Sequence, residues 1–495
     1  MRSKRLPPGS RKTLNTAMNC NLPDAFKNIP SEITRAVKLL EDAGFEAYIV
    51  GGCVRDILLG KEPKDYDITT SATTGEMYRV FADYTVIPTG VKHGTLTVKT
   101  GTLFTEITTY RMDGEYKDHR HPDEVLFTDQ LPMDLERRDF TINAMAYSPG
   151  KGIVDLFGGR EDLSNRIIRA VGDPRKRFDE DALRILRALR FSARLDFDIE
   201  KNTAEAMLEL SHSLSLISAE RVFSELRGII SVNNTSRLRE LFSGDFKRII
   251  FEIIPELEPA ANCLQETVFH LYTVYEHSVV AMVNIEDDPE LRLTMLLHDV
   301  GKPYVKTFDE NGTVHFKKHA EYGANLTGEI LERLRASNNM RRKICTLVLY
   351  HEYFRTGFKE FNGSARAAAG SLLVKTGPEN ALLLVKVMRA DLMGKNPEFT
   401  EGTSRKIDNL EAEIYNYIRA GRPLKLADLA VNGRNLKAAG IPDGKILGEV
   451  LNGLLRRVSA YETENEKELL LREAAAIYEA IRSQEDEGSG DAEKS

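Results

Sequence analysis

The sequence "YIVGGCVRDILLGKEPKDYDITT", Tyr48 to Thr70, decides the fold of the N-terminal part of the chain. A run of β-branched and aromatic residues ends in Gly51 and Gly52 and gives way to a helical pattern, which predicts a strand, a tight turn and a helix. Glycines at such a turn let backbone N–H groups approach an anion, and Arg55 adds positive charge in the first helical turn. The pattern indicates a phosphate-binding turn, although taken alone it is more typical of an ordinary strand–helix junction.

Two aspartates, Asp65 and Asp67, follow this helix in "KDYDITT". In an extended chain, side chains at i and i+2 point to the same face, and two carboxylates this close repel unless a divalent cation lies between them. Oxygen ligands of this kind suit Mg²⁺ or Mn²⁺. Glu106 in "TEITTYR" lies on a predicted strand that could pair beside this one, so it is predicted to complete a catalytic two-metal site. A solvent-facing glutamate is the alternative.

A second stretch, "DEDALRILRALRF" from Asp179 to Phe191, has the spacing of an amphipathic helix. Its arginines recur at every third position, so Arg184, Arg187 and Arg190 are predicted to step around the polar side while apolar residues gather on the other. The simplest interpretation is a solvated surface on which Asp181 pairs with Arg184 at i,i+3. A nucleotide-reading surface becomes the favoured interpretation because a phosphate turn and an aspartate pair lie upstream.

The bulk composition indicates a multidomain protein without a membrane span. The chain has 495 residues, 42% of them hydrophobic, and a formal net charge of −7. That length exceeds what one core usually serves, and no apolar run is long enough to cross a bilayer. Strand signals such as "EAYIVGG", "GTLTVKT" and "LFTEITTYR" end near Asp155, so the predicted fold class is α+β, a small mixed sheet followed by an all-α region. The four cysteines lack CxxC spacing, as expected for a cytoplasmic protein.

Four of the ten histidines fall in a separate C-terminal series. They are His277 in "YEHSVV", His298 beside Asp299 in "LLHDVGKP", His319 in "KKHAEYGA" and His351 in "YHEYF", and Asp391 follows in "RADLMG". Imidazole and carboxylate ligands together suit transition ions such as Mn²⁺, Ni²⁺, Co²⁺ or Zn²⁺. A His-Asp pair alone is not specific, and a structural, metal-poor helical domain is one interpretation of the series.

Several motifs, taken in order, resemble those of the bacterial class II CCA-adding enzymes, which are tRNA nucleotidyltransferases of the polymerase-beta-like superfamily. They are "GGCVRD", "DYD", "RMDGEYKDHRHPDEV", "RRDFTINAMAY", "DLFGG" with "IIRAVGDPRKRF", and "EDALRILRALRF". A later "AERVFSEL" resembles a further motif of that family. The resemblance runs from about Tyr48 to Arg194 and implies template-independent addition of CCA to the 3′ end of tRNA from CTP and ATP.

The resemblance implies a role for each matching residue. Asp65 and Asp67 would bind catalytic Mg²⁺, with Glu106 as a third acid. The nucleotide-binding residues would be Gly51, Gly52, Arg55, Arg138, Asp139, Asn143, Asp181, Arg184, Arg187 and Arg190. Cytosine and adenine both present an amino donor beside a ring-nitrogen acceptor, so one pair, Asp181 with Arg184, fits both bases and mismatches uracil and guanine. Arg187 and Arg190 would lie toward phosphates.

The histidine series resembles the HD phosphohydrolase superfamily, because a helix ends in His-Asp and continues into Gly-Lys-Pro. The resemblance implies that a divalent transition metal such as Mn²⁺, Ni²⁺ or Co²⁺ is held by His277, His298, Asp299 and Asp391. His319 and His351 would hold a second ion or bind phosphate. A metal-bound hydroxide would hydrolyse phosphate esters, and the natural hypothesis is repair of tRNA ends.

The expected organisation has six parts. They are a flexible basic arm (1–24), a nucleotidyltransferase head (25–165), a neck with the base-reading helix (166–250), an HD body (251–400), a helical tRNA-binding tail (401–483) and an acidic disordered tail (484–495). The loop Asp113–Val125 resembles one that CC-adding relatives lack, which favours full CCA addition. Poly(A) polymerase, an A-adding tRNA nucleotidyltransferase, and an HD phosphohydrolase whose head only binds tRNA are the open alternatives. The expected partners are tRNA, CTP and ATP, with no membrane.

Overall fold

The computed structural model describes residues 25–113 and 125–490 and divides the chain into two compact units. The first unit comprises Met1–Arg237 with Gly244–Ile253, and the second comprises Leu238–Ser243 with Ile254–Ser495. The basic arm and nearly all of the Asp113–Val125 loop lie outside the described residues. Among the helices that the structure does describe, none combines the length and apolarity needed to cross a membrane.

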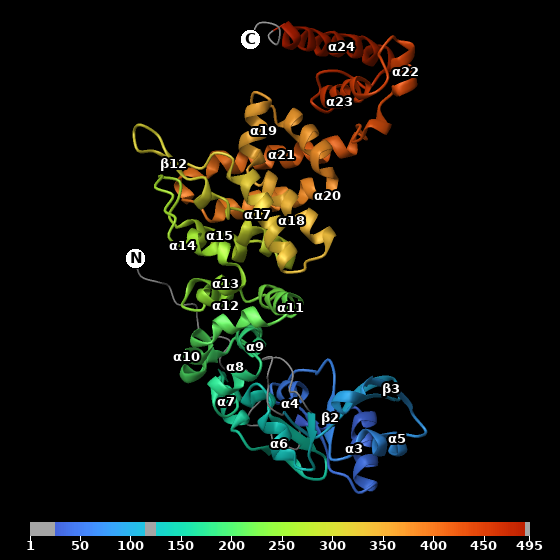
Figure 1. The fold of residues 1–495 in the computed structure, drawn as a ribbon, viewed down its shortest axis with the longest axis vertical. Coiled ribbons are helices and arrows are strands. Elements are labelled where there is room, and N and C mark those ends of the chain that lie inside the picture. The colour runs from blue at the N-terminus through green and yellow to red at the C-terminus, as the bar shows by residue number, and fades with distance from the viewer. Residues whose placement is uncertain (1–24, 114–124, 491–495) are drawn as a thin grey trace. The chain divides into compact units, whose positions relative to one another are not determined.

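A seven-stranded mixed sheet forms the head (Figure 1). Its strands are β1 (Ala47–Val50), β2 (Asp67–Thr70), β3 (Thr85–Gly90), β4 (Thr95–Thr100), β5 (Leu103–Thr109), β8 (Met145–Ser148) and β9 (Gly152–Asp155), and β6 (Arg111–Asp113) pairs with β7 (Val125–Phe127) in a separate ribbon. The strand order is β3-β4-β5-β2-β1-β8-β9, with β2 and β5 parallel and the other neighbours antiparallel. The three predicted strand segments are confirmed as β1, β4 and β5, and the α+β fold class is confirmed.

Short helices accompany the sheet of the head. They are α3 (Ser31–Asp42), α4 (Gly52–Leu58), α5 (Thr74–Val80), α6 (Leu131–Glu136) and α7 (Gly159–Asn165). In α3, Ile33, Val37 and Leu40 recur at helical spacing and are buried, and this apolar stripe packs α3 against β1. The side chain of Thr73 caps α5 by accepting from the backbone N–H of Glu76. In this sheet, Asp67 is the first residue of β2.

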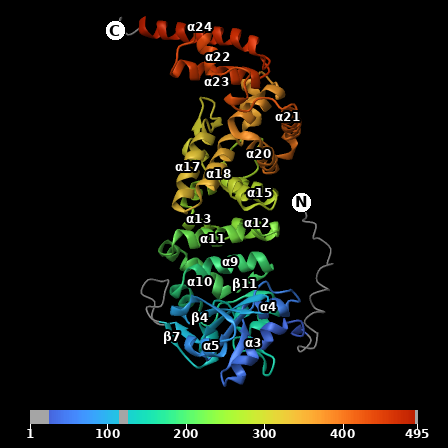
Figure 2. The same cartoon turned by 90° about the vertical axis from the view of Figure 1, so that its right-hand side faces the viewer.

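The neck of the first unit is helical, with α9 packed against α11 (Figure 2). Its elements are β10 (Ile167–Ile168), α8 (Pro174–Glu180), α9 (Leu183–Leu195), β11 (Asp198–Ile199), α10 (Lys201–Glu209), α11 (Ala219–Ile230), α12 (Thr235–Ser243) and α13 (Lys247–Ile253), the first part of α12 falling in this unit. The prediction of one continuous helix from Asp179 to Phe191 is wrong. Asp181 is extended, with φ −146° and ψ 100°, and its Oδ1 accepts from the N–H of Leu183 at 3.1 Å. A short aspartate side chain competes with the helical backbone in this way, so it separates two helices.

The second unit is a helical body followed by a helical tail. The body contains α14 (Glu258–Ala261), α15 (Val274–Asn284), α16 (Pro289–Leu297), the ribbon of β12 (Thr307–Phe308) and β13 (Val314–His315), α17 (His319–Arg333), α18 (Asn338–Tyr350), α19 (Tyr353–Glu360), α20 (Ala365–Met393) and α21 (Glu401–Arg419). The tail contains α22 (Gly433–Ala438), α23 (Lys445–Ser459) and α24 (Lys467–Gly490). A kink at Gly377, with φ 77°, precedes Pro378 within α20. The expected boundary of the acidic tail at residue 484 falls within α24, which continues to Gly490; "SQEDE" has no helix breaker before the final glycines.

Candidate active site of the head and candidate metal centre of the body

The glycine turn between β1 and α4 is bordered by two arginines. Gly51 has φ 84°, a conformation that a residue with a Cβ rarely adopts, and its N–H donates to the carbonyl of Met145 at 3.1 Å. A Cβ at Gly51 would lie 3.2 Å from Nη1 of Arg138, and one at Gly52 would lie 3.5 Å from Nη2 of Arg55. The backbone of the turn and the guanidinium groups of Arg55 and Arg138 therefore lie close together, as they do in anion-binding sites.

The three acids predicted to act together lie at one end of the parallel strand pair. Asp67 on β2 is the register partner of Glu106 on β5, which confirms that the two strands are neighbours, and Asp65 precedes Asp67 by two residues. Withdrawal of water by the surrounding protein, together with the carboxylates of Asp65 and Glu106, raises the pKa of Asp67 to about 6. Mutual repulsion of this kind is what a divalent cation relieves. Within the described residues, these three carboxylates do not converge to a group whose ligand atoms all lie within 4.8 Å of one another.

We expect Asp67→Asn to stabilise the first unit in EDTA at pH 8. The pKa of Asp67 is about 6 when folded and about 4 when unfolded, so folding disfavours the charged carboxylate, and the cost is present above pH 6 and disappears as the pH falls below about 4. Although neighbouring protein removes part of the water around Asp67, much of the residue still contacts solvent, so screening reduces the gain to on the order of 1 kcal/mol in the free energy of unfolding. Thermal melts at pH 8 and pH 4 measure it, and a variant less stable than the wild type at pH 8 would contradict the prediction.

Four predicted nucleotide-binding residues form one buried polar chain. Nη1 of Arg55 donates to Oδ1 of Asn143 at 2.6 Å, and Nδ2 of Asn143 donates to Oδ1 of Asp139 at 3.2 Å. Asp139 in turn accepts from Nε and Nη2 of Arg187 at 2.8 and 2.6 Å. Burial opposes ionisation of Asp139, but Arg187 outweighs it and holds the pKa of Asp139 below its usual value. Arg187 therefore links α9, through Asp139 and Asn143, to Arg55 beside the glycine turn.

The remaining residues of the arginine series are engaged in separate contacts. Arg184 is buried and donates to Oε2 of Glu180 at 2.7 Å and to the carbonyl of Arg137 at 3.0 Å. Asp181 does not pair with Arg184 but accepts from Nη2 of Arg221 at 2.9 Å. The prediction that Arg184 lies on an exposed polar side of the helix is thus wrong, because Glu180 and two backbone carbonyls accept from its guanidinium group within the neck.

Arg190 and an aromatic ring complete this part of the neck. Nε of Arg190 donates to Glu225 on α11 at 2.6 Å. The guanidinium groups of Arg55, Arg187 and Arg190 lie 5.3, 5.5 and 4.7 Å from the centroid of the Phe191 ring. Cations at these distances are attracted to an aromatic face. Phe191 is the residue around which these arginines gather.

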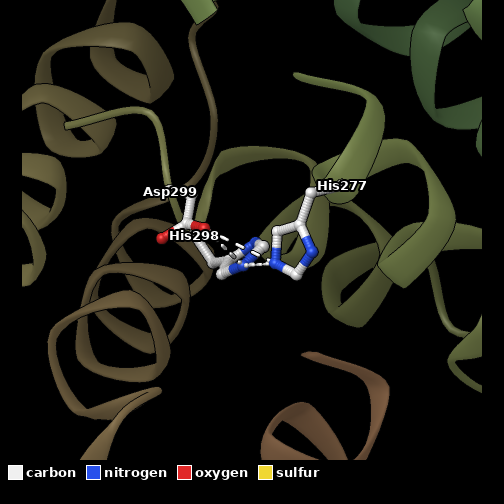
Figure 3. A group of neighbouring side chains, drawn as sticks. All are labelled: His277, His298 and Asp299. Carbon is white, nitrogen blue, oxygen red and sulfur yellow. Dashed lines mark hydrogen bonds and ion pairs between the residues drawn. The ribbon is translucent and has the colours of Figure 1, made fainter. Parts of the chain in front are cut away.

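In the second unit, the ends of several helices bring the predicted histidines into one buried cluster. Figure 3 shows one part of this cluster, His277, His298 and Asp299. His277 lies on α15, His298 directly follows α16, His319 begins α17, His351 follows α18 and Asp391 lies near the end of α20. Every one of these residues, and Asp299, is at most 3% exposed. Two sets of ligand atoms are close enough to hold an ion, one from His277, His298 and Asp299 and the other from Asp299, His319 and His351.

The tautomers of the histidines are fixed by backbone carbonyls. Nδ1 of His277, His298, His319 and His351 lies 2.7–3.0 Å from the carbonyls of Gly394, Met295, Phe316 and Val348, respectively. A carbonyl can only accept, so each Nδ1 donates and each Nε2 points into the cluster. Metal-binding histidines in proteins are commonly held in this manner.

Carboxylates and lysines complete the cluster. Nε2 of His277 lies 2.9 Å from Oδ1 of Asp391 and 3.2 Å from Nε2 of His298. Lys302 contacts Asp299 and Lys395 contacts Asp391, each at 2.6 Å. Burial lowers the pKa of His277. For His298, burial acts in the same direction but is outweighed by Asp299 and Asp391, which raise its pKa to about 9. The buried carboxylates of Asp299 and Asp391 are therefore each balanced by the ammonium group of a lysine, Lys302 and Lys395 respectively.

Comparison with known proteins identifies the family. Models for the poly(A) polymerase head domain, the RNA and SrmB-binding site of polymerase A, and tRNA nucleotidyltransferase domain 2 match residues 47–169, 196–260 and 318–474. A CCA-adding enzyme of Ligilactobacillus salivarius is 32% identical over 459 residues, covering 92% of this chain and 98% of the relative. The chain belongs to the bacterial CCA-adding enzymes.

Further relatives and solved structures agree with this family. A CCA-adding enzyme of Lactobacillus helveticus is 52% identical over 205 residues, a match that spans 41% of this chain and half the length of that relative. The crystal structure of the Bacillus stearothermophilus CCA-adding enzyme in complex with CTP has a TM-score of 0.63 at 27% identity and covers 92% of this chain and 98% of its own. The Thermotoga maritima CCA-adding enzyme complexed with tRNA has a TM-score of 0.56 at 22% identity, a likeness of fold alone.

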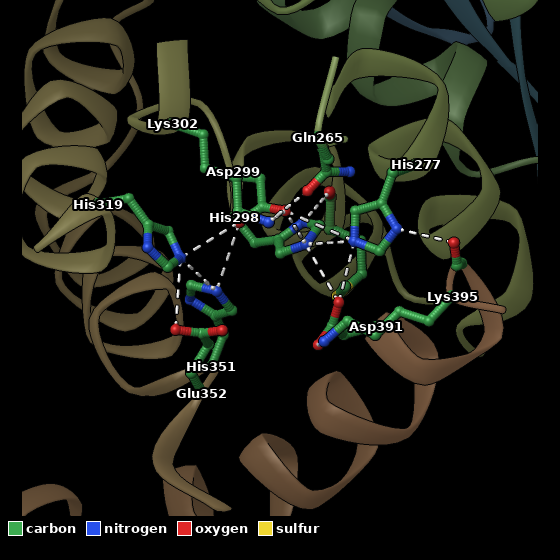
Figure 4. A network of polar contacts seen from close by, with 12 residues as sticks. Gln265, His277, His298, Asp299, Lys302, His319, His351, Glu352, Asp391 and Lys395 are labelled. Atoms are coloured by element: carbon green, nitrogen blue, oxygen red, sulfur yellow. Dashed lines mark hydrogen bonds and ion pairs between the residues drawn. The ribbon is translucent and has the colours of Figure 1, made fainter. Parts of the chain in front are cut away.

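In this member of the family, the sequence pattern predicts most of the polar residues that gather at the two sites and misses three. Lys302 and Lys395 are absent from the predicted metal centre, as is Glu352, whose Oε2 lies 3.6 Å from Nε2 of His319 (Figure 4). A signal for Glu352 was present, because it directly follows His351 in "YHEYF". Lys395 could not be found from sequence because it reaches the cluster only through the turn that follows α20.

Proposed function

We propose that this nucleotidyltransferase adds CCA to the 3′ end of tRNA, using CTP and ATP and a divalent cation such as Mg²⁺. The register pairing of Asp67 with Glu106, beside a glycine turn bordered by Arg55 and Arg138, carries the proposal. It agrees with relatives that are CCA-adding enzymes and with solved relatives in complex with CTP, ATP and tRNA. Carboxylates that repel one another therefore lie at the same end of the sheet as guanidinium donors suited to a triphosphate.

The reaction would transfer a nucleotidyl group without a covalent enzyme intermediate. The 3′-hydroxyl oxygen of tRNA attacks the α-phosphorus, the bond to the bridging oxygen of the β-phosphate breaks, pyrophosphate leaves, and the hydroxyl proton passes to solvent. Asp65, Asp67 and Glu106 would hold the cation, which when bound lowers the pKa of the hydroxyl and neutralises charge on the phosphates. Arg55 and Arg138 would orient the triphosphate at the glycine turn.

Base selection is proposed to involve Asp181 and Arg184, as the family resemblance implies. The carboxylate of Asp181 would accept from the amino group of cytosine or adenine, which requires it to release Arg221 or to use its other oxygen. Arg184 is enclosed by Glu180 and by two backbone carbonyls, so it would mainly fix the geometry of the α8–α9 junction unless these contacts rearrange.

We therefore expect Asp181→Asn to weaken base discrimination. An amide can donate to the carbonyl of uracil as well as accept, so the penalty of roughly 1–3 kcal/mol against UTP is reduced. The ratio of UTP to CTP incorporation should rise on the order of 10-fold in single-turnover assays. Asp179→Asn, an exposed aspartate two residues earlier, is the matched control and should keep the wild-type ratio. Loss of all activity with an unchanged ratio would count against a templating role for Asp181.

Incorporation of labelled CTP and ATP into a tRNA lacking its 3′ CCA tests the proposal. We expect incorporation in Mg²⁺, none in excess EDTA, and recovery after Mg²⁺ is restored. A chain that folds, binds tRNA and incorporates neither nucleotide would instead support the rival interpretation, an HD phosphohydrolase whose head only binds tRNA.

The buried histidine cluster favours a second activity, hydrolysis of phosphate esters. His277, His298, Asp299 and Asp391 would hold a divalent transition metal such as Mn²⁺, Ni²⁺ or Co²⁺, and their inward-facing Nε2 and carboxylate atoms support this assignment. When bound, such an ion activates water at neutral pH. Water would add to phosphorus, the ester P–O bond would break, and the alcohol would leave with a proton. Phosphate at a damaged tRNA 3′ end is the proposed substrate.

A further inference from the structure

Asp134 on α6 is a completely buried carboxylate in the head, with an exposed fraction of 0%. Burial opposes ionisation of this carboxyl, but the charges of Arg138 and Arg137 outweigh it and hold the pKa of Asp134 below its usual value. The side chain is therefore an anion at neutral pH. A buried anion is retained only where donors surround it, so the groups that donate to Asp134 indicate what it holds in place.

Both oxygens of Asp134 accept hydrogen bonds from the residues that directly follow α6. Oδ1 accepts from Nε and Nη2 of Arg137 at 3.0 and 2.8 Å, and Oδ2 accepts from Nη2 of Arg138 at 3.1 Å. Oδ2 also accepts from Oγ1 of Thr69 at 3.2 Å, and Thr69 lies two residues after Asp67 on β2. Asp134 therefore links both arginines to the strand that begins with the candidate metal ligand.

The contact with Asp134 fixes the direction of the Arg138 side chain. Nη2 is held by the carboxylate, whereas Nη1 lies on the side of the glycine turn, 3.2 Å from the place that a Cβ would take at Gly51. Burial and two carboxylates raise the pKa of Asp67, and the positive charge of Arg138 opposes this rise. Because a guanidinium is planar, holding one of its nitrogens sets the direction of the others. Arg138 is thus held between the glycine turn and the carboxylate group.

The same carboxylate also connects this part of the head with the neck. Arg137, whose guanidinium donates to Oδ1 of Asp134, accepts with its own backbone carbonyl from Nη2 of Arg184 at 3.0 Å. Arg184 lies on α9, in the part of the chain proposed to select the base. Asp134 thus holds two consecutive arginines, one beside the glycine turn and one in contact with the base-selecting region.

We propose that Asp134 is a positioning residue for nucleotide binding, which holds Arg138 in the orientation that contacts the triphosphate. The inference rests on the proposed role of the glycine turn in binding CTP and ATP. Asp134 itself touches no nucleotide, because its side chain is enclosed by protein. The phosphates are the part that CTP and ATP share, so loss of this contact should weaken the binding of both nucleotides equally and leave the affinity for tRNA unchanged.

Dissociation constants of CTP, ATP and tRNA, measured separately for the full-length chain in Mg²⁺, test the proposal. Asp134→Asn keeps the size of the side chain and removes its charge, and we expect both nucleotide dissociation constants to rise about 10-fold, as when one charge-assisted hydrogen bond is weakened. The dissociation constant of tRNA should stay at the wild-type value. Asp129→Asn, an exposed aspartate that precedes α6, is the matched control and should bind all three ligands as the wild type does.

A double-mutant cycle distinguishes a positioning role from a general effect on the fold. If Asp134 acts through Arg138, adding Asp134→Asn to Arg138→Ala should change nucleotide binding by less than about 2-fold, whereas independent effects would multiply. A multiplied loss, or unchanged binding of CTP and ATP by Asp134→Asn alone, would overturn the proposal. Asp134→Glu is a second variant, which keeps the charge but moves the carboxylate. It should weaken the binding of both nucleotides in the same direction, and unchanged binding would again overturn the proposal.

The outcomes separate this inference from the proposed nucleotidyl transfer. A wild type that binds CTP and ATP but incorporates neither, with weaker binding of both in Asp134→Asn, would support the positioning role and reject nucleotidyl transfer. A wild type that incorporates both nucleotides, with unchanged binding in Asp134→Asn, would reject only the positioning role. A wild type that binds neither nucleotide would reject both.

Discussion

Replacement of Asp67 by asparagine is expected to reduce incorporation of CMP and AMP into tRNA by at least about 10²–10³-fold, the loss typical of removing one electrostatic stabiliser of a reaction. Asp67 opens β2, pairs in register with Glu106 and lies two residues from Asp65, so it is the member of the carboxylate group that both others affect. Asparagine keeps the shape but removes the charge that would hold the cation. Rates of single-turnover incorporation at saturating CTP and ATP measure the loss.

The matched control for this prediction is Asp83→Asn, another exposed aspartate of the head. It lies beyond the end of α5, outside the carboxylate group, and should incorporate both nucleotides at the wild-type rate. Retention of the full rate by Asp67→Asn would remove Asp67 from the proposed metal site. Equal loss in both variants would indicate a general effect on the fold, and the metal assignment would have no support from the experiment.

The second large effect is expected for the combined His298→Ala and Asp299→Ala variant. Asp299 contacts both histidine pairs and Lys302, so its removal eliminates the shared ligand of the cluster. Hydrolysis of phosphate esters with Mn²⁺, Ni²⁺ or Co²⁺ should fall to background, measured by phosphate release from a tRNA ending in a 3′ or cyclic phosphate. Addition of CCA should persist, because the carboxylates and arginines of the proposed nucleotidyl-transfer site belong to the first unit.

These two substitutions can also lower the stability of the folded protein. Truncation of Asp299 leaves the buried ammonium of Lys302 without its 2.6 Å partner, a change that costs about 3–5 kcal/mol of stability in comparable buried pairs. The assay is therefore run well below the melting temperature of the variant. The matched control is His315→Ala with Asp309→Ala, a histidine–aspartate pair 3.0 Å apart on the exposed β12–β13 ribbon, which should keep both activities. Loss of CCA addition in the cluster variant alone would contradict independent sites.

In the head, the proximity of the candidate site residues could be predicted from sequence, because it follows from local patterns and from which strands pair. The glycines of the turn and the two aspartates are separated by one short helix, and Glu106 follows on the next β-rich run long enough to continue the sheet, so their proximity follows from topology. The break at Asp181 was not predictable from periodicity, because arginines and leucines continue at helical spacing through it. The extended backbone at Asp181 and the hydrogen bond from Leu183 to its carboxylate distinguish the break from a continuous helix.

The members of the buried histidine cluster could largely be predicted from sequence, but their surroundings could not. The His-Asp pair at the end of a helix indicated two residues of the cluster, and the other histidines belong to the same short series in the sequence. Which carboxylate lies beside which histidine depends on how α15, α18 and α20 pack, and that is set by contacts between residues far apart in the chain. Glu352 and Lys395 enter the cluster through that packing, and the inward direction of all four Nε2 atoms depends on backbone carbonyls that no side-chain pattern reveals.

Sequencing the 3′ ends of the products is the most direct test of template-independent CCA synthesis by this chain. The substrate is a tRNA that ends at the nucleotide before CCA, incubated with all four nucleoside triphosphates and Mg²⁺. We expect products that end in C, CC and CCA in temporal order, stopping at CCA, with uridine and guanosine excluded. Tails of adenosine alone, whether one residue as from an A-adding enzyme or many as from a poly(A) polymerase, would contradict it.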